Sequence, residues 1–176
     1  MGVIDYDLRK IKALLFDIDG VLSANVVSID LEGVPMRTVN IKDGYALHRA
    51  AQLGVNMGII SGGTCESVRL RYEKLGLKPE NIVLGAARKI VCYEVYKQRS
   101  GLQDNEILFV GDDIPDMEIM MVCGLPCCPA DAAPEVRAIA KYVSPYNGGY
   151  GVGRDIVEQY LKANGMWMQN AEAFGW

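Results

Sequence analysis

The sequence predicts an α/β fold, a Rossmann-like doubly wound parallel sheet. Three observations predict it: short apolar runs alternate with helical segments along nearly the whole chain, capping residues separate them, and 176 residues suit one domain. Right-handed helical crossovers between successive strands make such a sheet parallel. Residues 1–164 therefore form the expected domain, and residues 165–176 form a tail rich in aromatic side chains.

Each expected strand is a short apolar run that ends in a polar or turn-forming residue. In chain order these runs are residues 11–17, 55–61, 81–84, 106–110 and 125–129. The expected helices follow the runs, and several have Asp, Thr or Pro near their start and Gly at their end. They span residues 43–53, 64–75, 87–99, 115–122 and 153–163.

One segment breaks this alternation, directly after the first strand. Residues 26–30 and 36–40 have strand character, and Leu31-Glu32-Gly33-Val34-Pro35 separates them. Two such runs on either side of a turn that contains Gly and Pro are typical of a β-hairpin. We therefore expect a β-hairpin flap at about residues 24–41.

Composition argues against several classes of function. The net charge of −4 and the pI near 5.1 give no basic surface of the kind that nucleic-acid-binding proteins use. No segment has the length and apolar character of a membrane span, and the first residues do not resemble a secretory signal. The five cysteines include no Cys-x-x-Cys pair, which favours a reduced, cytoplasmic protein. We expect neither nucleic acid nor a membrane as a partner.

Two carboxylates emerge where the first strand ends, in Asp17-Ile18-Asp19-Gly20. Open α/β sheets bind ligands outside the carboxyl ends of their strands, so Asp17 and Asp19 can lean into one crevice. Asp-x-Asp-Gly is also common in turns, and the pair by itself leaves both interpretations open.

Other strands bring polar groups to the same edge. The second strand ends at Ser61-Gly62-Gly63, Lys89 lies near the start of the helix after the third, and the fourth leads into Gly111-Asp112-Asp113-Ile114-Pro115-Asp116. Two carboxylates about 4 Å apart repel by roughly 4 kcal/mol at an effective dielectric constant of 20, so such a cluster implies a hard divalent cation, Mg²⁺. A phosphoryl group would find the serine hydroxyl, the glycine amides and the lysine. The edge therefore predicts a phosphoryl-transfer centre.

Four ordered motifs resemble those of the haloacid dehalogenase superfamily, over residues 11–153: Asp17-x-Asp19-Gly20, Ser61-Gly62, Lys89 and Gly111-Asp112-Asp113-x-x-Asp116. The resemblance implies a phosphatase in which Asp17 forms an aspartyl-phosphate and Asp19 is the acid and base.

The same resemblance assigns roles to the remaining motif residues. It implies that Ser61, Gly62 and Lys89 bind the phosphate. It also implies that Asp112 ligates Mg²⁺ with Asp17 and the main-chain carbonyl of Asp19. Asp113 and Asp116 would orient the waters of the metal and the lysine.

The spacing of the motifs leaves no room for the cap domain that many members carry. Commonly, a capless member obtains its specificity from a neighbouring subunit. The segments Val39-Asn40-Ile41-Lys42-Asp43-Gly44-Tyr45-Ala46 and Gly148-Gly149-Tyr150-Gly151 are similar to those of the 3-deoxy-D-manno-octulosonate 8-phosphate phosphatases, a branch that forms tetramers and acts in lipopolysaccharide precursor synthesis. This resemblance implies a homotetramer and candidate substrate contacts at Asn40, Lys42, Asp43, Gly63 and Arg69. Asp43 also suits the amino-terminal end of a helix whatever the substrate.

Two positions depart from that branch. Gly63 and Tyr150 stand where it usually has arginines, which suit the carboxylate of an acidic sugar. Lys42, Arg69 or Arg71 could bind the carboxylate instead, although the two arginines are also typical of a solvated helix face. The alternative substrate is therefore a nine-carbon acidic sugar phosphate, KDN 9-phosphate or sialic acid 9-phosphate.

Two further alternatives stay open. The aromatic tail either packs on its own domain or covers the active site of a neighbouring subunit. A non-catalytic phospho-receiver or oligomerising subunit is the rival from another class of function, because receivers also combine acidic strand ends, a hydroxyl and a lysine. The order of the motifs favours an enzyme.

Overall fold

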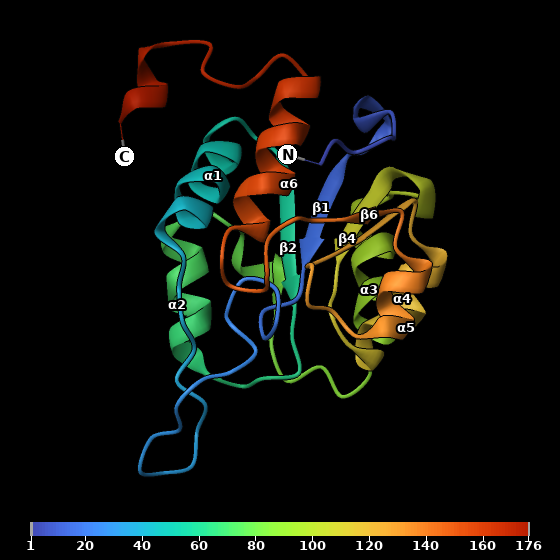
Figure 1. Ribbon diagram of the computed structural model, residues 1–176. Helices are drawn as coiled ribbons and strands as arrows, with labels where there is room; N and C mark the ends of the chain where they lie inside the picture. The colour runs from blue at the N-terminus through green and yellow to red at the C-terminus, as the bar shows by residue number, and fades with distance from the viewer. Residues whose placement is uncertain (1, 176) are drawn as a thin grey trace.

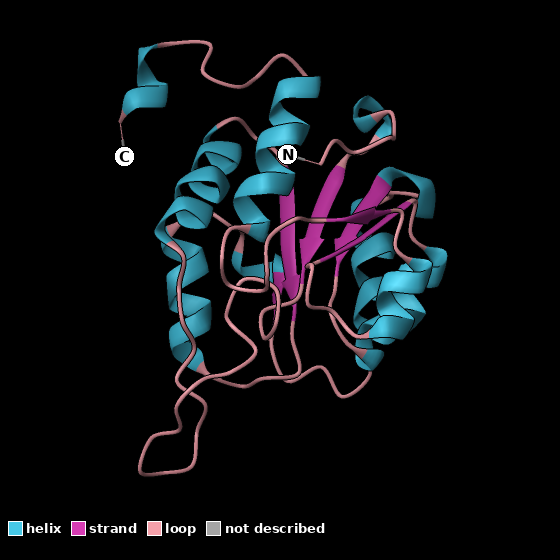
Figure 2. Ribbon diagram, viewed as in Figure 1, coloured by secondary structure: helices cyan, strands magenta, loops and turns pink. Residues whose placement is uncertain are grey.

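A computed structural model describes residues 2–175 and has one parallel sheet between two layers of helices (Figures 1 and 2). The strands are β1 (Ala13–Phe16), β2 (Asn56–Ile60), β3 (Ile82–Val83), β4 (Ile107–Val110), β5 (Leu125–Cys128) and β6 (Tyr142–Val143). Their order is β3-β2-β1-β4-β5-β6, so β1 lies between β2 and β4. The doubly wound parallel sheet predicted from the sequence is confirmed.

The helices cover the two faces of this sheet. They are α1 (Ile41–Gln52), α2 (Glu66–Lys74), α3 (Lys89–Ser100), α4 (Met117–Val122), α5 (Pro134–Ile139) and α6 (Val152–Ala163). Short 3₁₀ turns η1 (Leu8–Lys10), η2 (Pro79–Asn81), η3 (Asp104–Glu106), η4 (Ile114–Asp116) and η5 (Ala171–Phe174) connect or extend them. Within residues 2–175, no helix has the length and apolar character needed to cross a membrane.

The fully buried strand β1 divides the core into two parts. Leu14 and Phe16 pack with residues of α1, α2 and α6, whereas Ala13 and Leu15 pack with residues of α3, α4 and α5. Alternate side chains of a strand point to opposite faces, so the apolar run supplies both layers at once. Because β1 is paired on both sides and covered on both faces, the residues that follow it start from a rigid position.

Most expected elements agree with the structure to within a few residues, but α5 and β6 were missed. The segment expected as one helix at residues 115–122 is the turn η4 followed by α4. The expected flap follows a hairpin path without regular strands: one antiparallel bridge joins Ile29 and Pro35, and Asp30 accepts the amide of Val34 at 2.7 Å. It projects beyond the carboxyl ends of the strands (Figure 1).

The carboxyl-terminal tail lies at the opposite end of the molecule from the flap, beside α1 and α6 (Figure 1). Asn170 accepts a hydrogen bond from the buried Arg49 at 2.7 Å, and the ring of Trp167 lies 4.7 Å from the guanidinium carbon of Arg154. The hydroxyl of Tyr45 donates to the carbonyl of Ala173. These contacts dock the tail on its own domain.

Candidate active site

The ends of β1, β2 and β4 and the start of α3 surround one cavity of about 500 Å³. Parallel strands end at the same edge of the sheet, and this topology brings distant segments together there. The lining residues are Asp17, Asp19, Gly20, Asn25, Arg37, Ser61, Gly62, Gly63, Ala86, Ala87, Lys89, Asp112, Asp113, Pro115 and Asp116. The four sequence motifs therefore meet at a single cavity.

Asp17 is the most deeply placed acid of the first motif, directly after β1. Its side chain is 8% exposed, and its Oδ2 lies 2.8 Å from Nζ of Lys89. Burial raises the pKa of Asp17 to about 7; the charge of Asp116 adds to this effect, and Lys89 opposes it. A carboxylate held in this way is partly desolvated and points its oxygen into the cavity, as a nucleophile requires.

Lys89 is the buried cation of the site. Its Nζ bridges Oδ2 of Asp17 and Oδ1 of Asp116, at 2.8 and 2.7 Å. Burial lowers the pKa of Lys89, but the charges of these two aspartates outweigh burial and raise the pKa above its ordinary value. The lysine therefore stays charged and can hold a negatively charged group beside Asp17.

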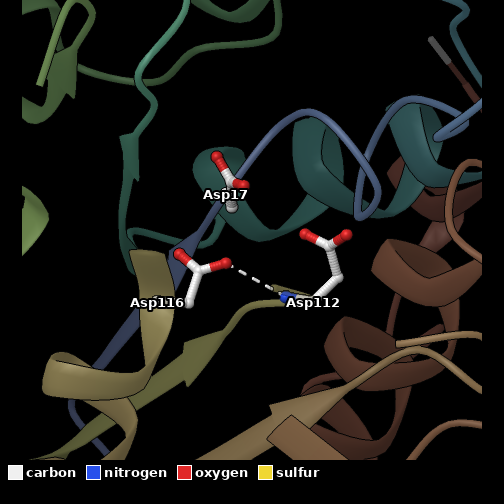
Figure 3. Close-up of side chains that lie close together, drawn as sticks. All are labelled: Asp17, Asp112 and Asp116. Carbon is white, nitrogen blue, oxygen red and sulfur yellow. Dashed lines mark hydrogen bonds between the residues drawn. The ribbon is translucent and has the colours of Figure 1, made fainter. Parts of the chain in front are cut away.

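The carboxylates of Asp17, Asp112 and Asp116 lie close together beside the turn after β4 (Figure 3). Asp17, Asp112 and Asp116 each offer an oxygen, and these oxygens lie within 4.8 Å of one another. Oδ2 of Asp116 accepts the backbone amides of Asp112 and Asp113, at 3.1 and 3.4 Å. This bonding fixes the turn, and it leaves Asp112 free to point towards Asp17.

Asp112 forms no ion pair with the residues that the structure describes, and the nearby charge of Lys89 opposes its burial only in part. Its Oδ1 is buried and has no hydrogen-bond partner in residues 2–175. Burial, followed by the charges of Asp17 and Asp116, raises the pKa of Asp112 to about 8. A Cβ at Gly20 would overlap the carboxylate of Asp112, so only glycine permits this approach. Three carboxylates with oxygens within 4.8 Å of one another fit a hard divalent cation, which prefers oxygen ligands.

Ser61 follows β2 on the other side of β1. It is 2% exposed, its amide donates to the carbonyl of Val83, and its hydroxyl accepts the amide of Gly63 at 3.1 Å. Gly62 lines the cavity beside it. This turn and Lys89 therefore line the same cavity.

The two aspartates of the first motif have different surroundings. Asp19 is 43% exposed at its side chain, and Arg37 from the flap binds both of its oxygens, at 3.0 and 2.9 Å. Sequence reasoning did not identify this arginine. Arg37 belongs to none of the four motifs, and the only available signal was a basic residue in the expected flap.

The candidate substrate contacts are divided among three places. Gly63 lines the acidic cavity. Asn40 and Lys42 line a neighbouring cavity of about 480 Å³, together with residues of the Gly149-Tyr150 turn. Asp43 is buried, where its Oδ1 accepts the amide of Arg154 at 2.8 Å. Arg69 donates to the carbonyl of Ile82 at 3.2 Å and lines neither of these two cavities.

Comparison with known proteins identifies relatives of this chain. A model of the haloacid dehalogenase-like hydrolases matches residues 80–156. The structure of a protein from Legionella pneumophila that is assigned to the HAD superfamily (subfamily III A) is 31% identical, with a TM-score of 0.84 over 90% of this chain and 86% of that chain.

Two further relatives carry a named activity. The 3-deoxy-D-manno-octulosonate 8-phosphate phosphatase KdsC of Escherichia coli K12 is 29% identical over 89% of this chain and 82% of that protein. The crystal structure of the corresponding phosphatase from Moraxella catarrhalis, in complex with magnesium, phosphate and KDO, is 27% identical, with a TM-score of 0.84 over 91% of each chain.

Proposed function

The chain belongs to the haloacid dehalogenase superfamily, and from the acidic cavity we propose that it is a magnesium-dependent phosphomonoester hydrolase that acts through an aspartyl-phosphate. The observation that carries this proposal is the placement of Asp17, buried at the end of the central strand and 2.8 Å from Lys89. A nucleophile beside a fixed cation is the arrangement that phosphoryl transfer needs.

The proposed reaction proceeds in two steps at Asp17. One of its oxygens attacks phosphorus, and the bond from phosphorus to the substrate alkoxide breaks while Asp19 donates a proton to that alkoxide. Asp19 then takes a proton from water, whose oxygen attacks phosphorus and releases phosphate from Asp17. Ser61, the amide of Gly62 and Lys89 hold the equatorial oxygens during both steps.

Mg²⁺ would be held by Asp17, Asp112 and the main-chain carbonyl of Asp19, with Asp113 and Asp116 around it. When bound, it neutralises the negative charge that these carboxylates and the phosphoryl group bring together. The unpaired oxygen of Asp112 supports this assignment, because a buried acceptor without a partner is costly. Asp116 also positions Lys89 through its bond of 2.7 Å to Nζ.

The proposed substrate is 3-deoxy-D-manno-octulosonate 8-phosphate, an intermediate of lipopolysaccharide precursor synthesis. The similarity to the phosphatases of E. coli and M. catarrhalis supports it. KDN 9-phosphate or sialic acid 9-phosphate is the alternative, favoured by Gly63 and Tyr150 at two positions where arginines are usual. Asn40 and Lys42 would contact the sugar from the neighbouring cavity.

We also propose a cytoplasmic homotetramer. The flap supports an assembly, because Val26, Ile29 and Leu31 are 85%, 68% and 102% exposed. Large apolar side chains that are exposed on one loop favour contact with another chain.

The test is a comparison of specificity constants for acidic eight- and nine-carbon sugar phosphates and for neutral sugar phosphates, with Mg²⁺ present. We expect repeated turnover and the highest kcat/KM for 3-deoxy-D-manno-octulosonate 8-phosphate. Preference for a nine-carbon acid would select the alternative substrate. Phosphorylation of the protein without repeated phosphate release would instead indicate a receiver, and no phosphate chemistry at all would favour an oligomerising subunit.

A further inference from the structure

Arg37 is the second cation of the acidic cavity. Among the lining residues, Arg37 and Lys89 carry positive charge. The side chain of Lys89 is 7% exposed, and its Nζ is bound to two aspartates. Within this cavity, Arg37 is therefore the cation other than Lys89 that a second negative group of a substrate could contact.

The flap directs this side chain inward. The neighbouring residues Met36 and Val39 are 56% and 53% exposed, whereas the side chain of Arg37 is 11% exposed. Its Nε and Nη2 bind the two oxygens of Asp19, and its Nη1 donates to the carbonyl of Pro35 at 3.1 Å. The planar guanidinium fork binds one carboxylate through two parallel hydrogen bonds, so a carboxylate of a substrate could bind it only by competing with Asp19.

Gly63 makes this position possible. A Cβ on Gly63 would lie 2.5 Å from Nη2 of Arg37 and 3.2 Å from its Cζ. Any larger residue at position 63 would therefore displace the guanidinium from its place above Asp19. Gly63 and Arg37, although far apart in the sequence, act as one unit at the entrance of the cavity.

We propose that Arg37 is a specificity-determining residue that binds a carboxylate on the leaving group of the substrate, and this inference rests on the phosphatase function proposed above. Asp19 is the residue that meets the leaving-group oxygen, so a guanidinium bound to Asp19 lies on the leaving-group side of the cavity. A substrate carboxylate takes the place of one Asp19 oxygen in the fork. Phosphate esters of sugar acids are thereby preferred over those of neutral sugars.

The test compares three substrates. Two are open-chain and differ at one end only: 6-phosphogluconate has a carboxylate where sorbitol 6-phosphate has a hydroxymethyl group. The third is 3-deoxy-D-manno-octulosonate 8-phosphate. The wild-type protein should prefer the acids. Arg37→Gln should lower kcat/KM for the acids by about 10- to 100-fold, mainly through KM, and should lower it much less for sorbitol 6-phosphate. Gly63→Ala, which keeps the arginine but displaces it, should shift selectivity in the same direction.

Arg9→Gln is the matched control, because Arg9 also binds both oxygens of an aspartate, Asp7. This pair precedes β1 and therefore lies at the end of that strand away from the cavity. It should leave selectivity unchanged. An equal loss of kcat for all three substrates in Arg37→Gln would mean that the arginine only positions Asp19, and would overturn the inference. So would a wild-type protein with no preference for acids. Absence of turnover with every phosphate ester would instead refute the phosphatase function itself.

Discussion

Replacing Asp43 with asparagine should remove one contribution to the pH dependence of stability. This carboxyl is 2% exposed, its Oδ1 accepts the amide of Arg154 at 2.8 Å, and its Oδ2 has no partner within residues 2–175. Burial raises its pKa from 3.8 to about 6, and the backbone amides of Arg154 and Gly153 oppose this rise. The side-chain oxygen of asparagine can still accept hydrogen bonds from these amides, and the side chain cannot ionise.

The direction of the pH effect follows from the pKa of Asp43, which is 3.8 in the unfolded chain and about 6 in the folded protein. Between about pH 4 and pH 6 the folded protein holds a proton on Asp43 that the unfolded chain has released, so stability falls as the pH rises and the loss is complete above pH 6. A rise of about 2 in pKa corresponds to about 3 kcal/mol, at about 1.4 kcal/mol for each pH unit. The stability of Asp43→Asn relative to wild type should therefore increase by about 3 kcal/mol from pH 4 to pH 7.

Urea unfolding of both proteins at pH 4 and pH 7, in EDTA, measures this difference. Asp5→Asn, which removes an exposed carboxylate, controls for the loss of charge. A difference between Asp43→Asn and wild type that is the same at both pH values would refute the reasoning. Kinetics of Asp43→Asn with 3-deoxy-D-manno-octulosonate 8-phosphate test the other expected role, because a substrate contact would appear as a raised KM.

Three further outcomes follow from the site and the tail. Asp17→Asn should abolish phosphate release, because an amide is a poor nucleophile, while circular dichroism should report an intact fold; turnover near the wild-type rate would exclude Asp17 as the nucleophile. Excess EDTA should stop the reaction, and added Mg²⁺ should restore it. Mg²⁺ should also raise the Tm of the EDTA-treated wild-type protein but not that of Asp112→Asn, because a cation that binds only the folded state stabilises that state. Full activity in EDTA would rule out the metal. Deleting the residues after Gly165 should lower the Tm by several degrees, because the buried Arg49 loses its partner Asn170; an unchanged Tm together with a raised KM would support the tail as a lid over a neighbouring subunit.

The parts of the fold that the sequence predicted are those with strong local patterns. β1, β2 and β4 are apolar runs buried on both faces, and this burial makes them visible as uninterrupted hydrophobic segments. α5 has six residues and β6 has two, so neither is long enough to display a period. The flap has the alternation of a hairpin, but its pairing stops at one bridge because most of its side chains face solvent.

The acidic cavity could be anticipated because its residues follow strands. Asp17, Ser61 and Asp112 each come directly after a strand or one residue later, and a parallel sheet necessarily brings such positions to one edge. The position of Arg37 could not be anticipated in this way. It depends on the path of an irregular loop and on the missing side chain of Gly63, and neither leaves a local pattern in the sequence.

The central place of β1 also has a consequence for how the chain acquires its active form. The strand β1, which Asp17 follows, is synthesised before the other strands of the sheet, yet its Ala13 pairs with Asn56 on one side and with Ile107 on the other. Contacts between residues so distant along the chain form slowly, because long loops must close before they are gained. A nascent chain that has not yet emerged as far as β4 exposes one edge of the apolar strand β1 and lacks Asp112. Catalytic competence and protection from aggregation are therefore reached in the same late step of folding.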